Sequence, residues 1–346
     1  MKAAGGRQKA VAHPAARQSS APSALLRTGD APDARRVEVA AAVITRPDGS
    51  FLLGQRPVGK VYAGYWEFPG GKIEAGEAPL PALARELREE LGIEVETAYP
   101  WLTRDYDYAH AAVRLRFYRV PQWSGTLRGR ENQRFVWQFP GAISVDPLLP
   151  ANAPILRALG LPPVYAITHA EALGATEQLL RLERALARGL RLVQVREKVL
   201  AGRALREFAA RVTALAHARG ARVVVNASAQ LARDVGADGV HLTSAQLKEA
   251  RARPDCALVG ASCHDADELA RAQTIGADFV VLGPVAPTPT HPGAAGLGWS
   301  WFAALLKDCP LPVYALGGLA PADLETAWRH GAHGIGMMRG AWPAPS

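Results

Sequence analysis

Three glutamates, Glu86, Glu89 and Glu90, are spaced so that they could do chemistry together. In a helix, side chains three and four positions apart lie on one face, so the three carboxylates would share that face. Clustered anions repel one another, and hard divalent cations with oxygen ligands remove this conflict. Such cations could neutralise a phosphate chain and activate a water for attack on phosphorus. The spacing therefore favours metal-assisted hydrolysis of a phosphoanhydride.

The segment around these glutamates has the features of a helix. Pro79 suits a first turn, residues 82–91 are good helix formers, and Gly92 stops the run. Three leucines on the neighbouring face are predicted to pack inward, namely Leu83, Leu87 and Leu91. The alternative is a solvated acidic face, on which the glutamates pair with Arg85 and Arg88.

The glutamates belong to a longer pattern, which reads GKIEAGEAPLPALARELREELGI over residues 71–93. Its nine fixed positions agree with the Nudix box, G-x5-E-x7-R-E-U-x-E-E-x-G-U, where U is aliphatic. The chain therefore resembles the Nudix hydrolases. The phrase WEFPGGKIEAGE at 66–77 is similar to the signature of the 8-oxo-dGTP diphosphatases of the MutT type. This likeness extends over about residues 37–159 and is thus broader than the box.

The resemblance implies a metal site and a nucleotide site. Catalysis is expected from the three helix glutamates, and the implied metal ligands are Gly70, Glu86, Glu89, Glu90 and Glu131. The implied cofactor is Mg²⁺, with Mn²⁺ as an alternative. The expected substrate-binding residues are Arg56 and Lys72 at the phosphates, Phe68 and Tyr108 beside the base, and Asn152 at the base edge.

Asn152 lies in LPANAPIL at 149–156, which resembles the PANxP turn of this family. An amide side chain donates and accepts at once, so it can read a purine edge bidentately. The alternative is that Asn152 merely caps a helix beginning at Pro154. For Tyr108, stacking on the base and ordinary core packing are equally compatible with the sequence.

Length and composition indicate how the chain is organised and which partners it has. Its 346 residues fit two domains rather than one. The net charge of +8 comes mostly from residues 1–36, where seven Lys or Arg face two Asp, so we expect no duplex nucleic acid partner. Residues 1–35 read as a disordered basic tail, although a transit peptide has a similar composition. Three cysteines without metal spacing and no membrane-length apolar run predict a cytoplasmic protein.

The predicted first domain, residues 36–160, has an α+β pattern. Residues 37–44 read as a strand, 51–56 as its hairpin partner, and 114–120 and 135–139 as further strands. With the acidic helix against the sheet, this resembles the Nudix α/β/α sandwich. Residues 161–163, LPP, read as a stiff linker.

Residues 164–346 alternate strand and helix patterns. Eight apolar runs lie at 164–168, 191–196, 222–227, 239–242, 258–262, 279–283, 312–317 and 334–338. Eight such units predict a compact (β/α)₈ TIM barrel. Only eight residues follow Met338, so the last helix is expected to be missing or vestigial.

This half resembles thiamine phosphate synthase and its relative TenI, through VQVREK, DGVHL, GASCH, GPVAPTPTHPG and ALGG. The resemblance implies a phosphate and ligand pocket formed by Gln194, Arg196, Lys198, Asn226, Thr288, Thr290, Gly317 and Gly318. Several positions depart from the synthase pattern. Ala227 and Gln246 stand where acidic Mg²⁺ ligands are expected, His291 replaces a lysine, and Pro284 stands where TenI has its histidine. His169, His241, His264 and His291 are each expected to be structural or to line the pocket.

The sequence thus predicts a fused enzyme. Its first half is expected to hydrolyse a nucleoside triphosphate, 8-oxo-dGTP above others, to the monophosphate and diphosphate. An alternative substrate is a thiamine-related diphosphate. The barrel is expected to be a phosphometabolite-binding regulatory module, a scaffold, another enzyme or a residual thiamine phosphate synthase. Nothing in the sequence fixes the oligomeric state.

Overall fold

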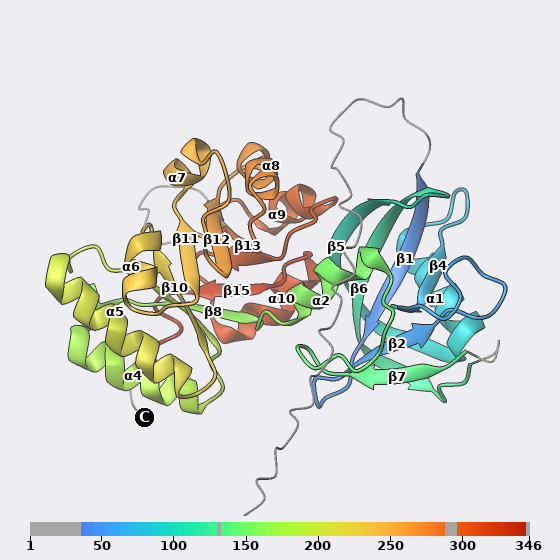
Figure 1. The fold of residues 1–346 in the computed structure, drawn as a ribbon, viewed down its shortest axis with the longest axis horizontal. Coiled ribbons are helices and arrows are strands. Elements are labelled where there is room, and N and C mark those ends of the chain that lie inside the picture. The colour runs from blue at the N-terminus through green and yellow to red at the C-terminus, as the bar shows by residue number, and fades with distance from the viewer. Residues whose placement is uncertain (1–35, 130–132, 288–295, 344–346) are drawn as a thin grey trace, which may run out of the picture. The chain divides into compact units, whose positions relative to one another are not determined.

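The computed structural model describes residues 36–129, 133–287 and 296–343. The predicted tail, Glu131, Thr288, Thr290 and His291 therefore lie outside the described residues. The part from residue 36 to 160 forms two sheets with two helices, and the part from 164 onward forms a closed barrel (Figure 1). Both predicted fold classes are confirmed.

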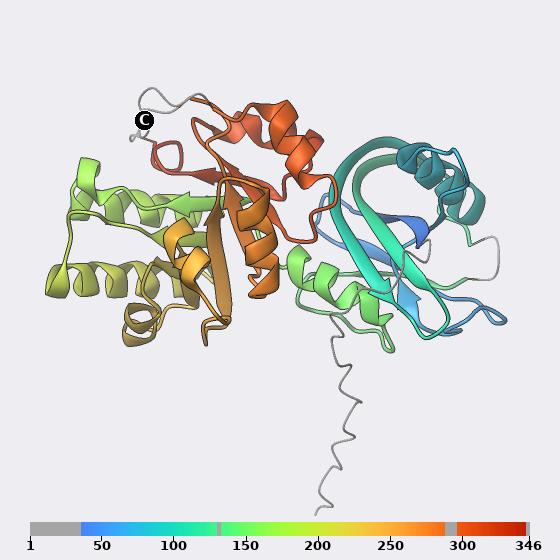
Figure 2. The same cartoon turned by 90° about the horizontal axis from the view of Figure 1, so that it is seen from above.

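The larger sheet of the first part is mixed, with the strand order β4-β1-β6-β5. Its strands are β1 (Val37–Ile44), β4 (Gly70–Lys72), β5 (Ile93–Asp107) and β6 (Ala112–Gly125). Strand β1 runs parallel to β6 and antiparallel to β4, and its residues 40–44 are buried. The turned view in Figure 2 shows helix α1 (Pro79–Leu91) beside the curved strands of this sheet.

The smaller sheet has the order β3-β2-β7, and the chain then forms two helical turns. Its elements are β2 (Phe51–Gln55), β3 (Trp66–Glu67) and β7 (Phe135–Gln138), followed by η1 (Pro150–Asn152) and α2 (Ala153–Leu159). The prediction that 51–56 is the hairpin partner of 37–44 is wrong. An isolated bridge from Thr45 to Phe51 joins the two segments, and then the chain passes into the other sheet. Both strands carry unbroken buried runs, which suit strands covered on both faces rather than a half-exposed hairpin.

The barrel consists of eight parallel strands whose order around the ring follows the sequence, β15 closing on β8. The strands are β8 (Val164–Ile167), β9 (Leu192–Val195), β10 (Arg222–Asn226), β11 (Gly239–Leu242), β12 (Leu258–Cys263), β13 (Phe279–Leu282), β14 (Val313–Leu316) and β15 (Gly334–Met337). Large side chains fill its centre, among them Tyr165, Phe279 and Tyr314, whose rings contact one another.

Helices cover the outside of the barrel between consecutive strands (Figure 1). They are α3 (Ala170–Leu173), α4 (Ala175–Ala187), α5 (Gly202–His217), α6 (Ala229–Asp234), α7 (Ser244–Glu249), α8 (Ala266–Thr274), α9 (Trp299–Leu306) and, after the turn η2 (Pro321–Asp323), α10 (Leu324–Arg329). After β15 the described residues, up to 343, form no further helix.

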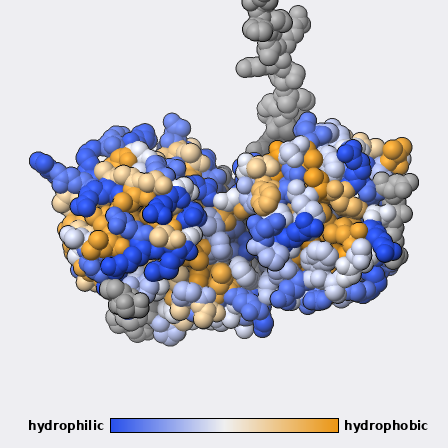
Figure 3. All heavy atoms as spheres, turned by 90° about the horizontal axis from the view of Figure 1, so that it is seen from below, coloured by the Kyte–Doolittle hydropathy of each residue, from blue (hydrophilic) through white to orange (hydrophobic). Residues whose placement is uncertain are grey.

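On the face shown in Figure 3, apolar residues form small patches among hydrophilic ones. Within the described residues, no helix is both long and apolar enough to span a bilayer.

Candidate active site and barrel pocket

Helix α1 is positioned by its leucines and ended by a glycine. Leu83, Leu87 and Leu91 are buried against the sheet, which fixes the rotation of the helix about its axis. Gly92 has a left-handed conformation with φ 69°, and its N–H donates to the carbonyl groups of the last turn. The helix therefore presents its glutamates on the faces that the buried leucines do not occupy.

Two of the three glutamates face one cavity. Glu86 and Glu90 line a cavity of about 900 Å³, together with Gly70 and Lys72. Glu89 does not line it, and its side chain is 59% exposed. The structure therefore places Glu86 and Glu90 at the cavity. Glu89 points to solvent, so the alternative of a solvated acidic face describes Glu89 better.

Arg85 is held by the carboxylates around it. Its guanidinium donates to Glu77 at 2.9 Å, Glu86 at 2.9 Å and Glu89 at 3.4 Å, and to the carbonyl oxygen of Lys72 at 3.2 Å. These hydrogen bonds, the one to Glu77 above all, raise the pKa of Arg85 and lower the pKa of Glu77. Arg85 and Glu77 thus fix the loop before α1 to the helix and orient Glu86.

The donor set at this end of the cavity suits a hard divalent cation. Within the described chain, no three His, Cys, Asp or Glu side chains converge as a complete metal site. Mg²⁺, however, is commonly bound by one or two carboxylates plus substrate phosphates. Glu86 and Glu90 supply two carboxylates beside the backbone of Gly70, whose φ is 145° and where an added Cβ would lie 2.1 Å from the Ala40 oxygen. These residues fit such an ion.

Asn152 lies in the same cavity, in the η1 turn. Its side chain is buried, at 4% exposure, and its Nδ2 has no hydrogen-bond partner within the described chain. Asn152 occupies the cap position of α2 but has helical backbone angles, and its side chain makes no capping hydrogen bond. The capping interpretation is therefore not supported. An unsatisfied buried amide donor is costly unless a ligand satisfies it.

Aromatic side chains form a wall of the cavity near Asn152. Tyr108 and His110 line it, and the Tyr108 ring lies 5.4 Å from the ring of Tyr62 and 5.5 Å from that of His110. Burial, with Glu67 nearby, raises the pKa of Tyr108 to about 12, so its hydroxyl stays neutral. Tyr62 has φ 61°, a conformation that non-glycine residues adopt mostly where the surroundings enforce it.

Arg56 is engaged by a carboxylate that the sequence reasoning missed. Its Nη1 lies 2.6 Å from Glu67, which also lines the cavity, and its Nε donates to the Val61 oxygen. Burial raises the pKa of Glu67, against the opposing effect of Arg56. Phe68 is 4% exposed and packs on Phe51 and Phe117 while contributing to the cavity wall. Glu67 follows a tryptophan in the motif WEFPGG, but nothing in that pattern indicates its partner.

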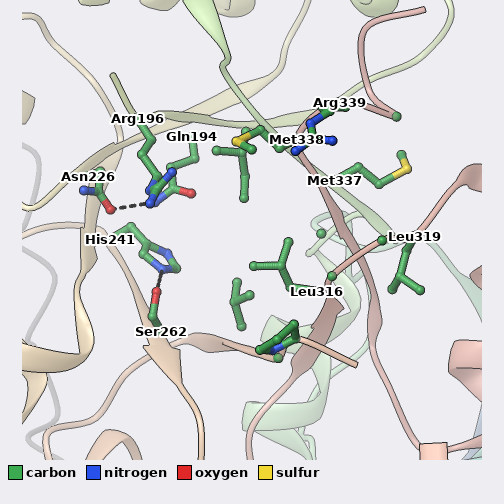
Figure 4. Close-up of a pocket in the computed structure, with 18 of the residues that line it drawn as sticks. Gln194, Arg196, Asn226, His241, Ser262, Leu316, Leu319, Met337, Met338 and Arg339 are labelled. Carbon is green, nitrogen blue, oxygen red and sulfur yellow. Dashed lines mark hydrogen bonds between the residues drawn. The ribbon is translucent and has the colours of Figure 1, made fainter. Parts of the chain in front are cut away.

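A second cavity, of about 500 Å³, opens at the carboxyl ends of the barrel strands. Of the predicted pocket residues, Gln194, Arg196, Asn226, Gly317 and Gly318 line it, and exposed Lys198 does not. Gln194 donates to the Asn226 oxygen at 3.0 Å, and the side chain of Arg196 lies beside this pair (Figure 4). The structure also adds Arg339, which follows β15 and lies across the cavity from them (Figure 4).

The barrel histidines differ in their surroundings. His241 is buried between the Tyr165 hydroxyl at Nδ1 and the Ser262 hydroxyl at Nε2, both at 3.0 Å, and burial lowers its pKa to about 3. His264 lines the cavity and donates from Nδ1 to the Gly283 oxygen at 2.7 Å. His169 does not line this cavity.

Comparison with known proteins agrees with this geometry. The family model described as NUDIX domain matches residues 34–159, and the one described as thiamine monophosphate synthase matches residues 164–341. The second match covers more than half of the chain, and the first contains the glutamate helix and all the residues that line its cavity.

The chain belongs to both families. It is a Nudix domain of the MutT-like kind, followed by a thiamine phosphate synthase/TenI domain.

Relatives of each domain support this assignment. The CTP pyrophosphohydrolase of Escherichia coli is 43% identical over 36% of this chain and 91% of its own length. The 8-oxo-dGTP diphosphatase of Haemophilus influenzae is 38% identical over 37% of this chain and 93% of its own length. The thiamine-phosphate synthase of Azorhizobium caulinodans is 34% identical over 53% of this chain and 88% of its own length. The Nudix domain is thus similar to hydrolases named for two different nucleotides.

Proposed function

We propose that the Nudix domain hydrolyses nucleoside triphosphates to monophosphate and diphosphate, with 8-oxo-dGTP as its preferred substrate. This activity would keep oxidised guanine nucleotides out of DNA synthesis. The observation that carries the proposal is one cavity that is lined both by Glu86 and Glu90 and by Asn152, which is buried and has an unpaired Nδ2. At about 900 Å³, this cavity is large enough for a nucleotide.

The acidic end suits a polyphosphate through an intervening cation. Mg²⁺ bound by Glu86 and Glu90 would neutralise phosphate oxygens and activate a water for in-line attack. Arg85 orients Glu86 through its 2.9 Å hydrogen bond, and its positive charge offsets the repulsion between Glu86 and the neighbouring acids. Lys72 is exposed at the same end, where it can contact the outer phosphates.

Asn152 and the aromatic side chains of the cavity suit a nucleobase. The Asn152 amide offers a donor to a base carbonyl, and its oxygen offers an acceptor to a neighbouring N–H. The aromatic rings of Phe68 and Tyr108 line the cavity, and such rings can pack on a stacked base. A base that cannot pair with the amide leaves it unsatisfied in a buried site, so such a base is rejected.

CTP is the second candidate, because the 43% identity to a CTP pyrophosphohydrolase exceeds the 38% identity to an 8-oxo-dGTP diphosphatase. Cytosine also presents a donor beside an acceptor, its 4-amino group next to the ring nitrogen N3, so Asn152 could pair with it. A thiamine-related diphosphate is a third candidate, suggested by the fusion to the barrel.

A substrate panel separates these candidates. Full-length protein with magnesium would be assayed on 8-oxo-dGTP, dGTP, CTP, dCTP and thiamine diphosphate, with EDTA as the metal-free arm. We expect the highest kcat/KM for 8-oxo-dGTP and no turnover in EDTA. Asn152→Ala should reduce the preference for 8-oxo-dGTP over dGTP by about tenfold, the value of one or two lost base contacts. An unchanged ratio, or CTP as the best substrate, overturns the assignment of 8-oxo-dGTP.

A further inference from the structure

The barrel cavity is lined by cations and neutral groups. Its charged lining consists of Arg196 and Arg339, and the described lining includes no Asp or Glu. The two lining histidines are His241, which stays neutral, and His264, which donates to a backbone carbonyl. The cavity therefore attracts an anion directly.

The carboxylates closest in sequence to these lining residues already accept hydrogen bonds from other groups. Glu197 follows Arg196 and accepts from the backbone N–H groups of Ala170 and Glu171 at the start of α3. Glu268 is 3% exposed and accepts from the Ser244 hydroxyl, from the His264 N–H at 2.8 Å and from Lys248 at 2.9 Å. Neither residue lines the cavity.

Neutral residues, Ala227 and Gln246, occupy the two positions at which the synthase resemblance implies acidic Mg²⁺ ligands. Gln246 Nε2 donates to the Ala227 oxygen at 2.8 Å, and Gln246 also forms a capping box with Thr243 at the start of α7. Ala227 contributes a methyl group. Mg²⁺ requires anionic or well-oriented oxygen ligands, and these residues do not fit it.

From this disagreement we infer that the barrel binds an organic phosphate monoester directly, without a divalent cation. Arg196 and Arg339 lie on different sides of the cavity and supply the positive charge that a metal supplies elsewhere (Figure 4). Gly317, Gly318 and Gly336 allow close approach of a phosphate to the backbone.

The remaining lining indicates the rest of the ligand. Val281, Pro284, Leu316 and Met337 form an apolar wall suited to a neutral ring. The hydrogen bond between Gln194 and Asn226 fixes two amide groups at the edge of the cavity, and each retains polar atoms for a ligand. The ligand class is therefore a phosphate monoester that carries a neutral, flat body.

Calorimetric titration of full-length protein with phenyl phosphate in EDTA tests this inference. In the proposed function, nucleotide binding by the Nudix domain depends on a cation that EDTA removes, so the titration reports the barrel. We expect saturable binding that changes less than twofold when magnesium replaces EDTA. Arg196→Ala and Arg339→Ala should each weaken it at least tenfold, about 1.4 kcal/mol. Inorganic phosphate and phenol should each bind more weakly than phenyl phosphate.

Two control variants test whether the loss of binding is specific to the arginines of the barrel cavity. Arg188→Ala removes an exposed arginine after α4 and should leave binding unchanged. Glu90→Gln should also leave it unchanged while abolishing nucleotide hydrolysis, so the barrel and Nudix proposals fail separately. Binding that requires magnesium, binding that survives in both cavity-arginine variants, or no binding of phenyl phosphate overturns the inference.

Discussion

Gly71 lies directly against the carboxylate of Glu86. A Cβ added at Gly71 would lie 2.1 Å from the carboxyl carbon of Glu86 and 2.2 Å from its Oε2. No real side chain tolerates such a distance, so the carboxylate must move if the glycine is replaced. The glycine that opens the Nudix box is therefore required for the space it leaves to a functional carboxylate.

This contact predicts that Gly71→Ala lowers kcat without unfolding the domain. Displacing Glu86 by an ångström or more removes an aligned carboxylate, for which a loss of about 100-fold is expected. Gly76→Ala is the matched control. Gly76 has φ 83° and open space around its Cα, so alanine there costs about 1 kcal/mol of stability and leaves the carboxylate in place. Steady-state kinetics and thermal unfolding of both variants check this, and equal activities would contradict it.

Glu90→Gln is expected to abolish most hydrolysis. The substitution keeps the size of the side chain but removes one of the two carboxylates of helix α1 that line the cavity. We expect a fall in kcat of at least about 100-fold, because loss of a metal-binding charge weakens stabilisation of the transition state. The activity should be measured across a magnesium titration.

The matched control for Glu90→Gln is Glu94→Gln. Glu94 pairs with Arg88 outside the cavity, and both side chains are about half exposed. A surface pair of this kind contributes roughly 0–1 kcal/mol to stability, so the control should retain its activity. Near wild-type turnover by Glu90→Gln at ordinary magnesium concentration would refute the metal-binding role.

The sequence predicted most of the secondary structure but not all of its pairing. The eight barrel strands are short apolar runs between amphipathic helices, so periodicity identifies each one. Strand β5 was missed, because Pro100 and three register shifts against β6 break the alternation of apolar and polar residues. The false hairpin arose because a turn signal shows where the chain reverses but not which sheet it enters.

The candidate site also has features that the sequence alone could not predict. The spacing of Glu86, Glu89 and Glu90 places them on one side of a helix, but only the fold shows that Glu89 points to solvent. Likewise, the ion pair of Arg56 with Glu67 joins the residue after β2 to strand β3 and has no local sequence signal. The sequence also allowed Asn152 to be a helix cap, and only the structure, through its backbone angles and the missing capping hydrogen bond, argues against that role.

His241 is expected to make the barrel sensitive to acid. Its pKa is lowered from 6.5 to about 3, first by burial and second by Arg196. The unfolded chain therefore binds the extra proton below about pH 6.5, and stability falls as the pH drops from there towards 3. The loss attributable to His241 between pH 7 and 5.5 is about 1 kcal/mol. Buried His333, whose pKa is also lowered, should add a similar dependence.

Comparison of wild type with His241→Gln isolates this effect. The variant has no imidazole to protonate at position 241, although it loses hydrogen bonds to Tyr165 and Ser262 and should be less stable at neutral pH. The free energies of unfolding of the two proteins, measured by denaturant titration, should therefore converge as the pH falls from 7 to 5.5. A constant difference across this range would show that His241 does not titrate as proposed.

Ala227→Asp is expected to leave the barrel without magnesium-dependent thiamine phosphate synthesis. Ala227 has φ 64°, a conformation that Asp tolerates better than Ala, so the fold should be retained. One carboxylate does not make a magnesium site, because the Gln246 amide remains bonded to the Ala227 oxygen and His291 still replaces the expected lysine. The assay would supply a thiazole phosphate and a pyrimidine diphosphate with and without magnesium. The double variant, Ala227→Asp with Gln246→Glu, tests whether carboxylates at both positions create a magnesium site. Robust synthesis by the single variant would contradict the metal-free interpretation of the barrel.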